Sequence, residues 1–285
     1  MKVVIPGGSG HIGTFLSRAL SAAGHEVVVL GRRTGVRWDG RTLGPWAAEL
    51  DGADAVVNLA GRSVSCRYTT ESLREMMASR VDSARAVGAA IAAAARPPRV
   101  WLQMSTATIY AHRFDAPNDE ATGVLGGAEP DVPGYWSYSV EIAKNWEAAQ
   151  AAADTPATRK VALRTAIVMS PERGGAFTVL RGLVRAGLGG PVAGGAQYVS
   201  WLHETDFVRT VEFLLDRELD GPVNLAAPDP LPQREFMRVL RSDTELLRKS
   251  RRVVPTRLLE AGFTFRYPDW PTAARDLVAP HRAEP

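Results

Sequence analysis

The chain has 285 residues, of which 45% are hydrophobic and 23% charged, and its formal net charge is +3. This balance is typical of a globular protein, so it excludes the fibrous and the intrinsically disordered classes. The single cysteine, Cys66, cannot form an internal disulfide, and the apolar stretch 87–95 is far shorter than the roughly 20 residues of a membrane-spanning helix. We therefore expect a cytoplasmic protein without a membrane segment and with a core for about two domains.

Short apolar runs rich in β-branched residues alternate along the chain with stretches of helical periodicity. The predicted strands cover residues 3–5, 26–30, 54–60, 100–104, 160–169 and 223–225. The predicted helices run from Ile12 until Gly24 ends the pattern, and over residues 71–95, 139–153 and 202–217. Strands that alternate with helices pair in parallel through helical crossovers, which predicts an α/β fold with a Rossmann-like, doubly wound parallel sheet.

The composition changes after Pro171, where glycines become frequent. Such stretches are typical of loops, here expected to close over a ligand, so a smaller C-terminal substrate lobe is predicted to start at this point. The predicted domains are residues 1–171, to which residues 203–226 return, and residues 172–285. The two lobes are then interleaved along the chain.

A glycine-rich segment connects the first predicted strand to the first predicted helix. Residues 7–13 read Gly-Gly-Ser-Gly-His-Ile-Gly and match the spacing G-x-x-G-x-x-G. Glycines allow a tight turn and a close approach of the backbone to a pyrophosphate, and the helix N-terminus offers free N–H groups. The segment predicts a dinucleotide site, the alternative being a purely structural turn. The expected cofactor-binding residues are Gly7, Ser9, Gly10, His11, Ile12 and Gly13.

The end of the second predicted strand bears on the choice of cofactor. An Asp or Glu there would accept hydrogen bonds from the ribose 2′-hydroxyl of NAD(H), but the strand ends in Gly31-Arg32-Arg33. Two guanidinium groups suit a 2′-phosphate, which they bind with charge-assisted hydrogen bonds. Arg32 and Arg33 therefore predict a preference for NADP(H), with NAD(H) as the alternative cofactor and exposed loop charges as the alternative reading of the two residues.

Further motifs accompany the glycine loop over nearly the whole chain. They are Trp38-Asp39-Gly40, Asn58-Leu59-Ala60-Gly61, Ser79-Arg80-Val81, Ser105-Thr106-Ala107-Thr108-Ile109-Tyr110, Asn145-Trp146-Glu147, Leu163-Arg164-Thr165 and Ser200-Trp201-Leu202-His203. Together they resemble the extended short-chain dehydrogenase/reductase superfamily, and more narrowly its atypical branch of NAD(P)-dependent epimerase-like, or cell-division-inhibitor-like, proteins. Residues 255–263 resemble the small C-terminal module of that branch, while the connection 236–252 is shorter than is usual there.

The resemblance implies a Rossmann-like NAD(P)-binding domain and a C-terminal substrate lobe. It places the segment Asn58, Leu59, Ala60 and Gly61 beside the adenosine half of the cofactor, although Asn58 can also be read as a turn residue that ends a strand. It places Ser105 and Thr106 near the nicotinamide, where a hydroxyl polarises the substrate oxygen.

The usual catalytic dyad of the superfamily is a tyrosine followed four residues later by a lysine, and this chain lacks it. Tyr138 is followed by Ile142 in the fourth place, and Lys144 is preceded by Val140. Alignment on Glu147 puts Ser139 at the tyrosine position and Ala143 at the lysine position. The candidate catalytic residues are then Thr106, Ser105, Tyr138 and Tyr110. Tyr135, Glu141, Lys144 and His203 are further titratable candidates; the alternative readings are a solvated helix residue for Lys144 and a structural residue at a helix entry for His203.

Two classes of function fit these observations. The first is an NADP(H)-dependent oxidoreductase or epimerase with a non-standard catalytic site, acting on a small oxygenated metabolite. The second is a non-catalytic NAD(P)-binding sensor or scaffold. The expected partner is a small-molecule substrate, with no metal, no membrane and no nucleic acid, and the chain is expected to be a monomer or a homodimer.

The basic excess of the chain gathers in one segment. Between Arg234 and Arg257 there are eight basic and three acidic residues. The pattern indicates either a solvated helix face or a patch that faces an anionic substrate, since a local excess of charge favours partners of opposite sign.

Overall fold

The computed structural model describes residues 1–285 except 130–133, 173, 187–189, 241–251 and 280–285. Its main sheet contains the strands β1 (Lys2–Pro6), β2 (Glu26–Gly31), β3 (Val36–Arg37), β4 (Ala55–Asn58), β5 (Val100–Thr106), β6 (Arg159–Thr165) and β10 (Gly221–Leu225). Their order is β10-β6-β5-β4-β1-β2-β3, so the sheet grows from β1 in both directions. This is the doubly wound, Rossmann-like arrangement, and the predicted fold class is confirmed.

The middle of the sheet is apolar on both faces. β1 pairs in parallel with β2 on one side and with β4 on the other, where Val4 lies opposite Val56. Every residue of β4 is buried, as are the apolar residues of β1. Helices cover both faces of a parallel sheet, so its inner strands read as continuous apolar runs, which is why these segments could be recognised in the sequence.

Three helices that connect strands of the main sheet carry candidate site residues or lie beside them. They are α1 (His11–Ala22), α2 (Thr70–Ala93) and α3 (Gly134–Ala151). α1 buries Phe15, Leu16 and Leu20, which recur at helical spacing. α2 begins at a capping box in which the side chains of Thr69 and Ser72 accept each other's backbone N–H. α3 begins five residues before the predicted Ser139, so Tyr138 lies inside the helix.

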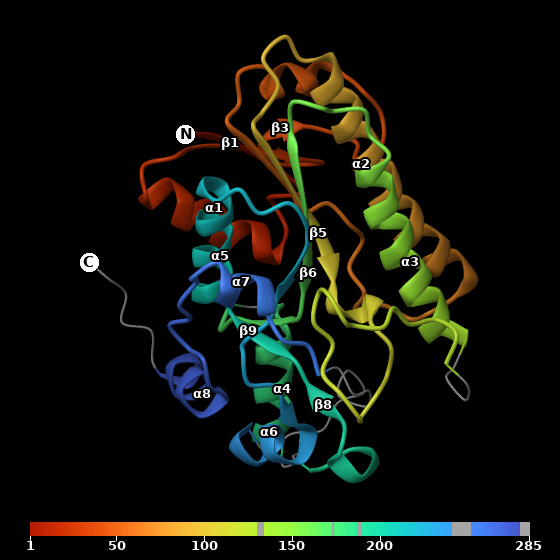
Figure 1. The fold of residues 1–285 in the computed structure, drawn as a ribbon, viewed down its shortest axis with the longest axis vertical. Coiled ribbons are helices and arrows are strands. Elements are labelled where there is room, and N and C mark those ends of the chain that lie inside the picture. Colours follow the sequence, from red (N-terminus) through yellow and green to blue (C-terminus); the bar gives the residue numbers. More distant parts are fainter. Residues whose placement is uncertain (130–133, 173, 187–189, 241–251, 280–285) are drawn as a thin grey trace. The chain divides into compact units, whose positions relative to one another are not determined.

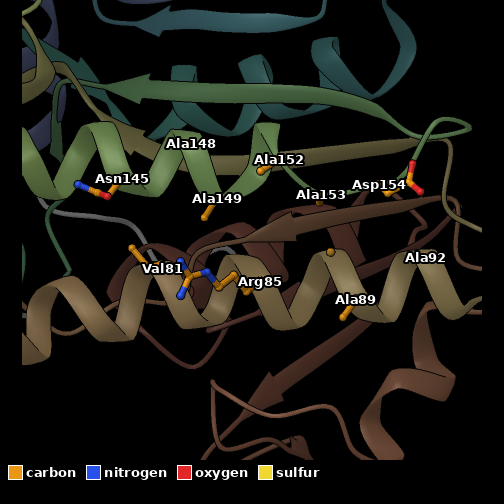
Figure 2. Close-up of a pocket in the computed structure, with 11 residues that line it drawn as sticks. Val81, Arg85, Ala89, Ala92, Asn145, Ala148, Ala149, Ala152, Ala153 and Asp154 are labelled. Carbon is orange, nitrogen blue, oxygen red and sulfur yellow. The ribbon is translucent and has the colours of Figure 1, made fainter.

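α2 and α3 lie side by side, with a shallow groove of about 510 Å³ between them (Figures 1 and 2). Alanines line most of it, with Arg85 on α2 and Asn145 on α3 among the few polar side chains that border it. Small side chains explain the groove, because they leave the space between two adjacent helices unfilled at the surface.

The chain divides into two compact units. The first unit holds Met1–Ile109, Leu125–Arg164 and Val208–Val223, and the second holds Tyr110–Val124, Thr165–Phe207 and Asn224–Pro285. Residues 110–124, which the sequence placed in the first domain, thus group with the second unit. The domain boundary after residue 171 stays a prediction.

The second unit is built from short elements around its own core. They are β7 (Ile167–Met169), α4 (Ala176–Arg185), β8 (Tyr198–Val199), β9 (Trp201–His203), β11 (Leu231–Pro232), α6 (Gln233–Leu240), α7 (Thr256–Glu260) and α8 (Trp270–Val278). In the core, Phe236 stacks on Trp270 at 4.1 Å between ring centroids, and Trp201 packs against the same indole at 5.0 Å. Most of the short connection 236–252, including the basic residues from 241 to 251, lies outside the described residues.

Two predicted elements are wrong in their extent. The strand predicted over 160–169 is two strands, β6 and β7, and β7 leaves the main sheet to pair with β9. The helix predicted over 202–217 starts later, as α5 (Glu204–Asp216), because Leu202 and His203 pair with β7 as part of β9. Apolar runs are typical of both kinds of buried element, so their periodicity did not reveal either boundary. The predicted return of residues 223–225 to the main sheet is confirmed by β10.

None of the described helices has the length and apolarity that would let it cross a membrane.

Candidate cofactor and active site

The glycine loop fits the role predicted for it, because two of its glycines allow no side chain. Gly7 has a φ of +77°, and a Cβ there would lie 2.7 Å from the Cα of Ala60. A Cβ at Gly13 would lie 2.4 Å from the Cα of Gly8. The turn is therefore folded back on itself and against the end of β4, which leaves its backbone close to any ligand on this edge of the sheet.

The N-terminus of α1 is open to an anion. Gly10 is the N-cap and offers no side-chain acceptor, and the first turn of α1 contains no acidic residue. In addition, the Nε2 atom of His11 is buried and has no hydrogen-bond partner among the described residues. Free N–H groups and the positive end of the helix dipole suit a phosphate, so the residues present fit the diphosphate of a dinucleotide.

Arg32 and Arg33 follow β2, and both are exposed. A Cβ at the preceding Gly31 would lie 2.5 Å from the backbone oxygen of Thr34 and 3.1 Å from the Oγ of Ser9. The turn after β2 thus packs against the glycine loop. Neither arginine forms an ion pair with a described residue, so both guanidinium groups are available to a ligand.

The segment after β4 is fixed by a buried amide. Asn58 is fully buried; its Nδ2 donates to the Oε1 of Gln103 at 2.9 Å, and its Oδ1 accepts the N–H of Ala60 at 3.1 Å. Leu59 donates its N–H to the oxygen of Pro6 in β1 at 2.8 Å. The side chain of Asn58 holds the turn, while the backbone of Ala60 and Gly61 forms the edge that a cofactor would meet.

Ser105 belongs to a buried ion-pair network. Its Oγ donates to the Oε1 of Glu147 at 2.6 Å, and Arg164 donates through Nε (3.0 Å) and Nη2 (2.8 Å) to the two oxygens of the same carboxylate. The exposed fractions of the Arg164 and Glu147 side chains are only 9% and 16%. This network joins β5, α3 and β6, and it engages the Ser105 hydroxyl.

The four candidate catalytic residues differ in accessibility. Thr106 and Tyr138 are half-buried, whereas Ser105 and Tyr110 are buried. The Thr106 Oγ1 lies 3.1 Å from the Oγ1 of Thr108 and accepts its N–H, while Tyr138 makes no hydrogen bond with another described residue. Their accessibility makes Thr106 and Tyr138 the stronger candidates of the four, and the catalytic assignment stays a prediction.

Tyr110 lies in the second unit, in a cluster that sequence reasoning missed. Its hydroxyl donates to the Oδ1 of Asn224 at 2.8 Å, and the backbone N–H of Asn224 donates to the Oε1 of Glu120 at 2.8 Å. The other oxygen of Glu120 accepts the N–H of Arg257 at 3.5 Å. Burial raises the pKa of the Glu120 carboxyl, despite these hydrogen bonds.

Glu120→Gln is expected to make the protein less sensitive to rising pH. Because the pKa of Glu120 is raised on folding, ionisation of this carboxyl favours the unfolded state, and stability is lost as the pH rises from the ordinary carboxyl range through the raised value. The glutamine keeps an acceptor for Asn224 and cannot ionise. Thermal unfolding of the wild type and the variant between about pH 4 and about pH 7 should show a difference that grows with pH. Glu260→Gln, an exposed carboxyl on α7, is the control, and parallel profiles would contradict the expectation.

Two further titratable residues have structural contacts. The Nζ of Lys144 donates to the backbone oxygen of Gly126 at 2.6 Å, so this lysine is tied to a loop and is not simply solvated. His203 ends β9, where its Nδ1 accepts the N–H of Thr205 at 3.1 Å and its Nε2 lies 3.2 Å from an oxygen of Asp276 on α8. His203 thus connects the entry of α5 with the last described helix. Within the described part of the chain, no cluster of His, Cys, Asp or Glu could hold a metal ion.

Comparisons with known proteins find relatives over nearly the whole chain. The sequence model of the NAD dependent epimerase/dehydratase family matches residues 3–226, and that of a domain of unknown function, DUF1731, matches residues 239–277. The epimerase family protein SDR39U1 of Bos taurus is 29% identical over 98% of this chain and 100% of its own length. The epimerase family protein Mb2239 of Mycobacterium bovis is 30% identical over 93% of each chain.

One relative has been solved in complex with a cofactor. The crystal structure of human epimerase family protein SDR39U1 (isoform 2) with NADPH superposes with a TM-score of 0.84 at 27% identity, over 97% of this chain and 99% of the human one. The resemblance drawn from the sequence motifs is confirmed, including the separate small module at the C-terminal end. This chain belongs to the NAD dependent epimerase/dehydratase family.

Proposed function

We propose that this protein is an NADP(H)-dependent oxidoreductase or epimerase that acts on a small oxygenated metabolite. The observation that carries the proposal is the pair of exposed, unpaired guanidinium groups of Arg32 and Arg33, beside a glycine loop whose geometry fits a dinucleotide. The NADPH in the structure of the human relative supports the choice of cofactor.

The chemistry divides between the cofactor and a few side chains. A bound nicotinamide supplies the acceptor or donor of a hydride. In the proposal, the Thr106 hydroxyl orients the substrate oxygen: it accepts the N–H of Thr108 and donates to the Thr108 hydroxyl, and the substrate oxygen takes the place of that second, hydroxyl partner. The Tyr138 phenol gives or takes the proton of that oxygen. No lysine assists it at the usual position, where the buried Ala143 stands.

Tyr138→Phe is expected to lower kcat by about 100-fold, and Thr106→Ala by about ten-fold, since a positioned general acid contributes at least two orders of magnitude. The measurement is turnover of a panel of carbonyl and hydroxyl metabolites with NADPH or NADP⁺. Ser139→Ala is the matched control, because the Ser139 hydroxyl already bonds the backbone oxygen of Tyr135. Turnover that survives both substitutions would remove these residues from the catalytic role.

The second candidate is a non-catalytic NAD(P)-binding sensor or scaffold. The observation that favours it is the missing dyad, together with the engagement of Ser105 by Glu147. NADPH binding measured by fluorescence, in the absence of turnover or isomerisation of the whole panel, would support this class. Equal or tighter binding of NADH would contradict the preference for NADP(H) in either class.

For the partners, we propose a small-molecule substrate, which is either uncharged or carries an anionic group. Monomer and homodimer are the two alternatives for the oligomeric state, and sedimentation of the purified chain separates them. The groove between α2 and α3 is the candidate contact surface for a homodimer in that experiment (Figure 2).

A further inference from the structure

A positively charged group lies against the end of the segment 58–61, and the proposed function does not use it. Arg80 lies on α2, and its guanidinium rests on the backbone of Gly61, where a Cβ would be 3.3 Å from both Cγ and Cζ of the arginine. The Cζ of Arg80 also lies 5.1 Å from the ring centroid of Trp146 on α3. The guanidinium is therefore held between the backbone of Gly61, which a cofactor would meet, and the indole of Trp146.

No residue that the structure describes forms an ion pair with this group. Its Nη1 donates to the backbone oxygen of Met76 at 3.0 Å and its Nη2 to that of Arg62 at 3.1 Å, and both acceptors are neutral. Of the residues that the structure describes, no carboxylate lies within 4.0 Å of Arg80, and the nearby Glu75 is already paired with Arg62. Burial lowers the pKa of Arg80 to about 10. Arg80 is half-buried, so its charge is partly withdrawn from water without a described counter-ion, and binding of an anion would offset that cost.

A buried donor beside Arg80 lacks an acceptor among the described residues. Trp146 is 4% exposed, and its indole Nε1 has no hydrogen-bond partner among the described residues. Two exposed aromatic rings lie in the same region. Tyr68, whose phenol interacts electrostatically with Arg80, is 44% exposed, and Tyr135 is 39% exposed. The centroids of these two rings are 5.8 Å apart. Buried donors are nearly always paired, so the unsatisfied indole N–H of Trp146 beside the charge of Arg80 indicates a place for a ligand that carries acceptor atoms.

We propose that Arg80 binds an oxyanion, a phosphate or a carboxylate, of the ligand that occupies the edge beside Gly61. A guanidinium offers two parallel N–H groups that match two oxygens of either group. The oxyanion has two sources, the diphosphate of the dinucleotide and an acidic group of the substrate. The assignment rests on the proposed function, because both sources belong to its cofactor or its substrate. Arg80 would bind either oxyanion through the same charge-assisted hydrogen bonds.

The test compares Arg80→Gln and Arg80→Lys with Arg74→Gln, an exposed arginine of the same helix. The probes are inorganic phosphate and pyrophosphate, titrated calorimetrically into the protein without cofactor. We expect R80Q to bind pyrophosphate about ten-fold or more weakly than wild type, R80K to lie between them, and R74Q to match wild type. Without ligand, R80Q should unfold at the wild-type temperature or above it, because it removes a charge without a counter-ion. A lower unfolding temperature of R80Q, with unchanged anion binding by R80K, would assign Arg80 a structural role instead.

Titration with nucleotides separates the two sources of the oxyanion. If Arg80 binds the diphosphate, R80Q weakens NADPH and NADH by the same factor. If it binds an acidic group of the substrate, R80Q binds NADPH normally but the NADPH-saturated variant no longer binds inorganic phosphate. Equal anion affinities of R80Q and R74Q in every titration would overturn the proposal. If the protein binds pyrophosphate through Arg80 but binds no dinucleotide, the proposed function is contradicted and the role of Arg80 stands.

Discussion

Replacing Arg32 and Arg33 together by alanine is expected to weaken NADPH binding about 100-fold and to leave NADH binding within about two-fold of wild type. Each charge-assisted hydrogen bond to a phosphate is worth about 1.5–3 kcal/mol, which is about ten-fold or more in affinity. Both guanidinium groups are exposed and have no protein partner among the described residues, so their loss should not disturb the fold. The measurement is the fluorescence of each reduced nucleotide during titration with protein.

The matched control removes the same charge elsewhere. Arg74→Ala/Arg85→Ala takes two exposed arginines from α2 and should leave both nucleotide affinities unchanged. Higher ionic strength should weaken NADPH binding by the wild type more than by the Arg32/Arg33 variant, because salt screens exposed charges. An equal loss of NADPH and NADH affinity in that variant would show that the arginines act on a group common to both nucleotides, and the predicted preference for NADP(H) would be wrong.

The features that the sequence predicted well are those in which the residue type alone restricts the backbone. Gly7 is necessary because its φ is +77°, and Gly13 because a Cβ would collide with Gly8; both restrictions follow from one local turn. The buried runs of β1 and β4 were recognisable for a similar reason, since a strand covered on both faces has no polar alternation.

Contacts between distant segments could not be predicted in this way. The hydroxyl of Tyr110 finds its acceptor on Asn224, 114 positions later in the chain, and Ser105 finds Glu147, 42 positions later. Both residues were chosen as catalytic candidates from their motif, and only the structure shows that their hydroxyls are engaged in buried networks. The sequence identifies Arg80 only as part of a motif. That its charge has no described counter-ion, beside Gly61 and Trp146, follows only from the structure.

Loss of the buried ion pair between Glu147 and Arg164 should strongly destabilise the first unit. Glu147→Ala leaves the guanidinium of Arg164, which is 9% exposed, without its two carboxylate contacts, and such a change costs about 3–5 kcal/mol. For a chain of this size, that corresponds to a fall of roughly 6–15 °C in the midpoint of thermal unfolding. Circular dichroism at increasing temperature measures it.

Two comparisons isolate the cause of that loss. Glu49→Ala breaks the more exposed pair with Lys2, whose side chains are 34% and 23% exposed, and should cost less than about 1 kcal/mol. Glu147→Gln/Arg164→Met removes both charges and keeps similar volumes, so it should be more stable than Glu147→Ala, because no unpaired charge is left buried. If Glu147→Ala and Glu49→Ala lower the midpoint equally, the pair does not hold β5, α3 and β6 together, and packing alone stabilises these three elements.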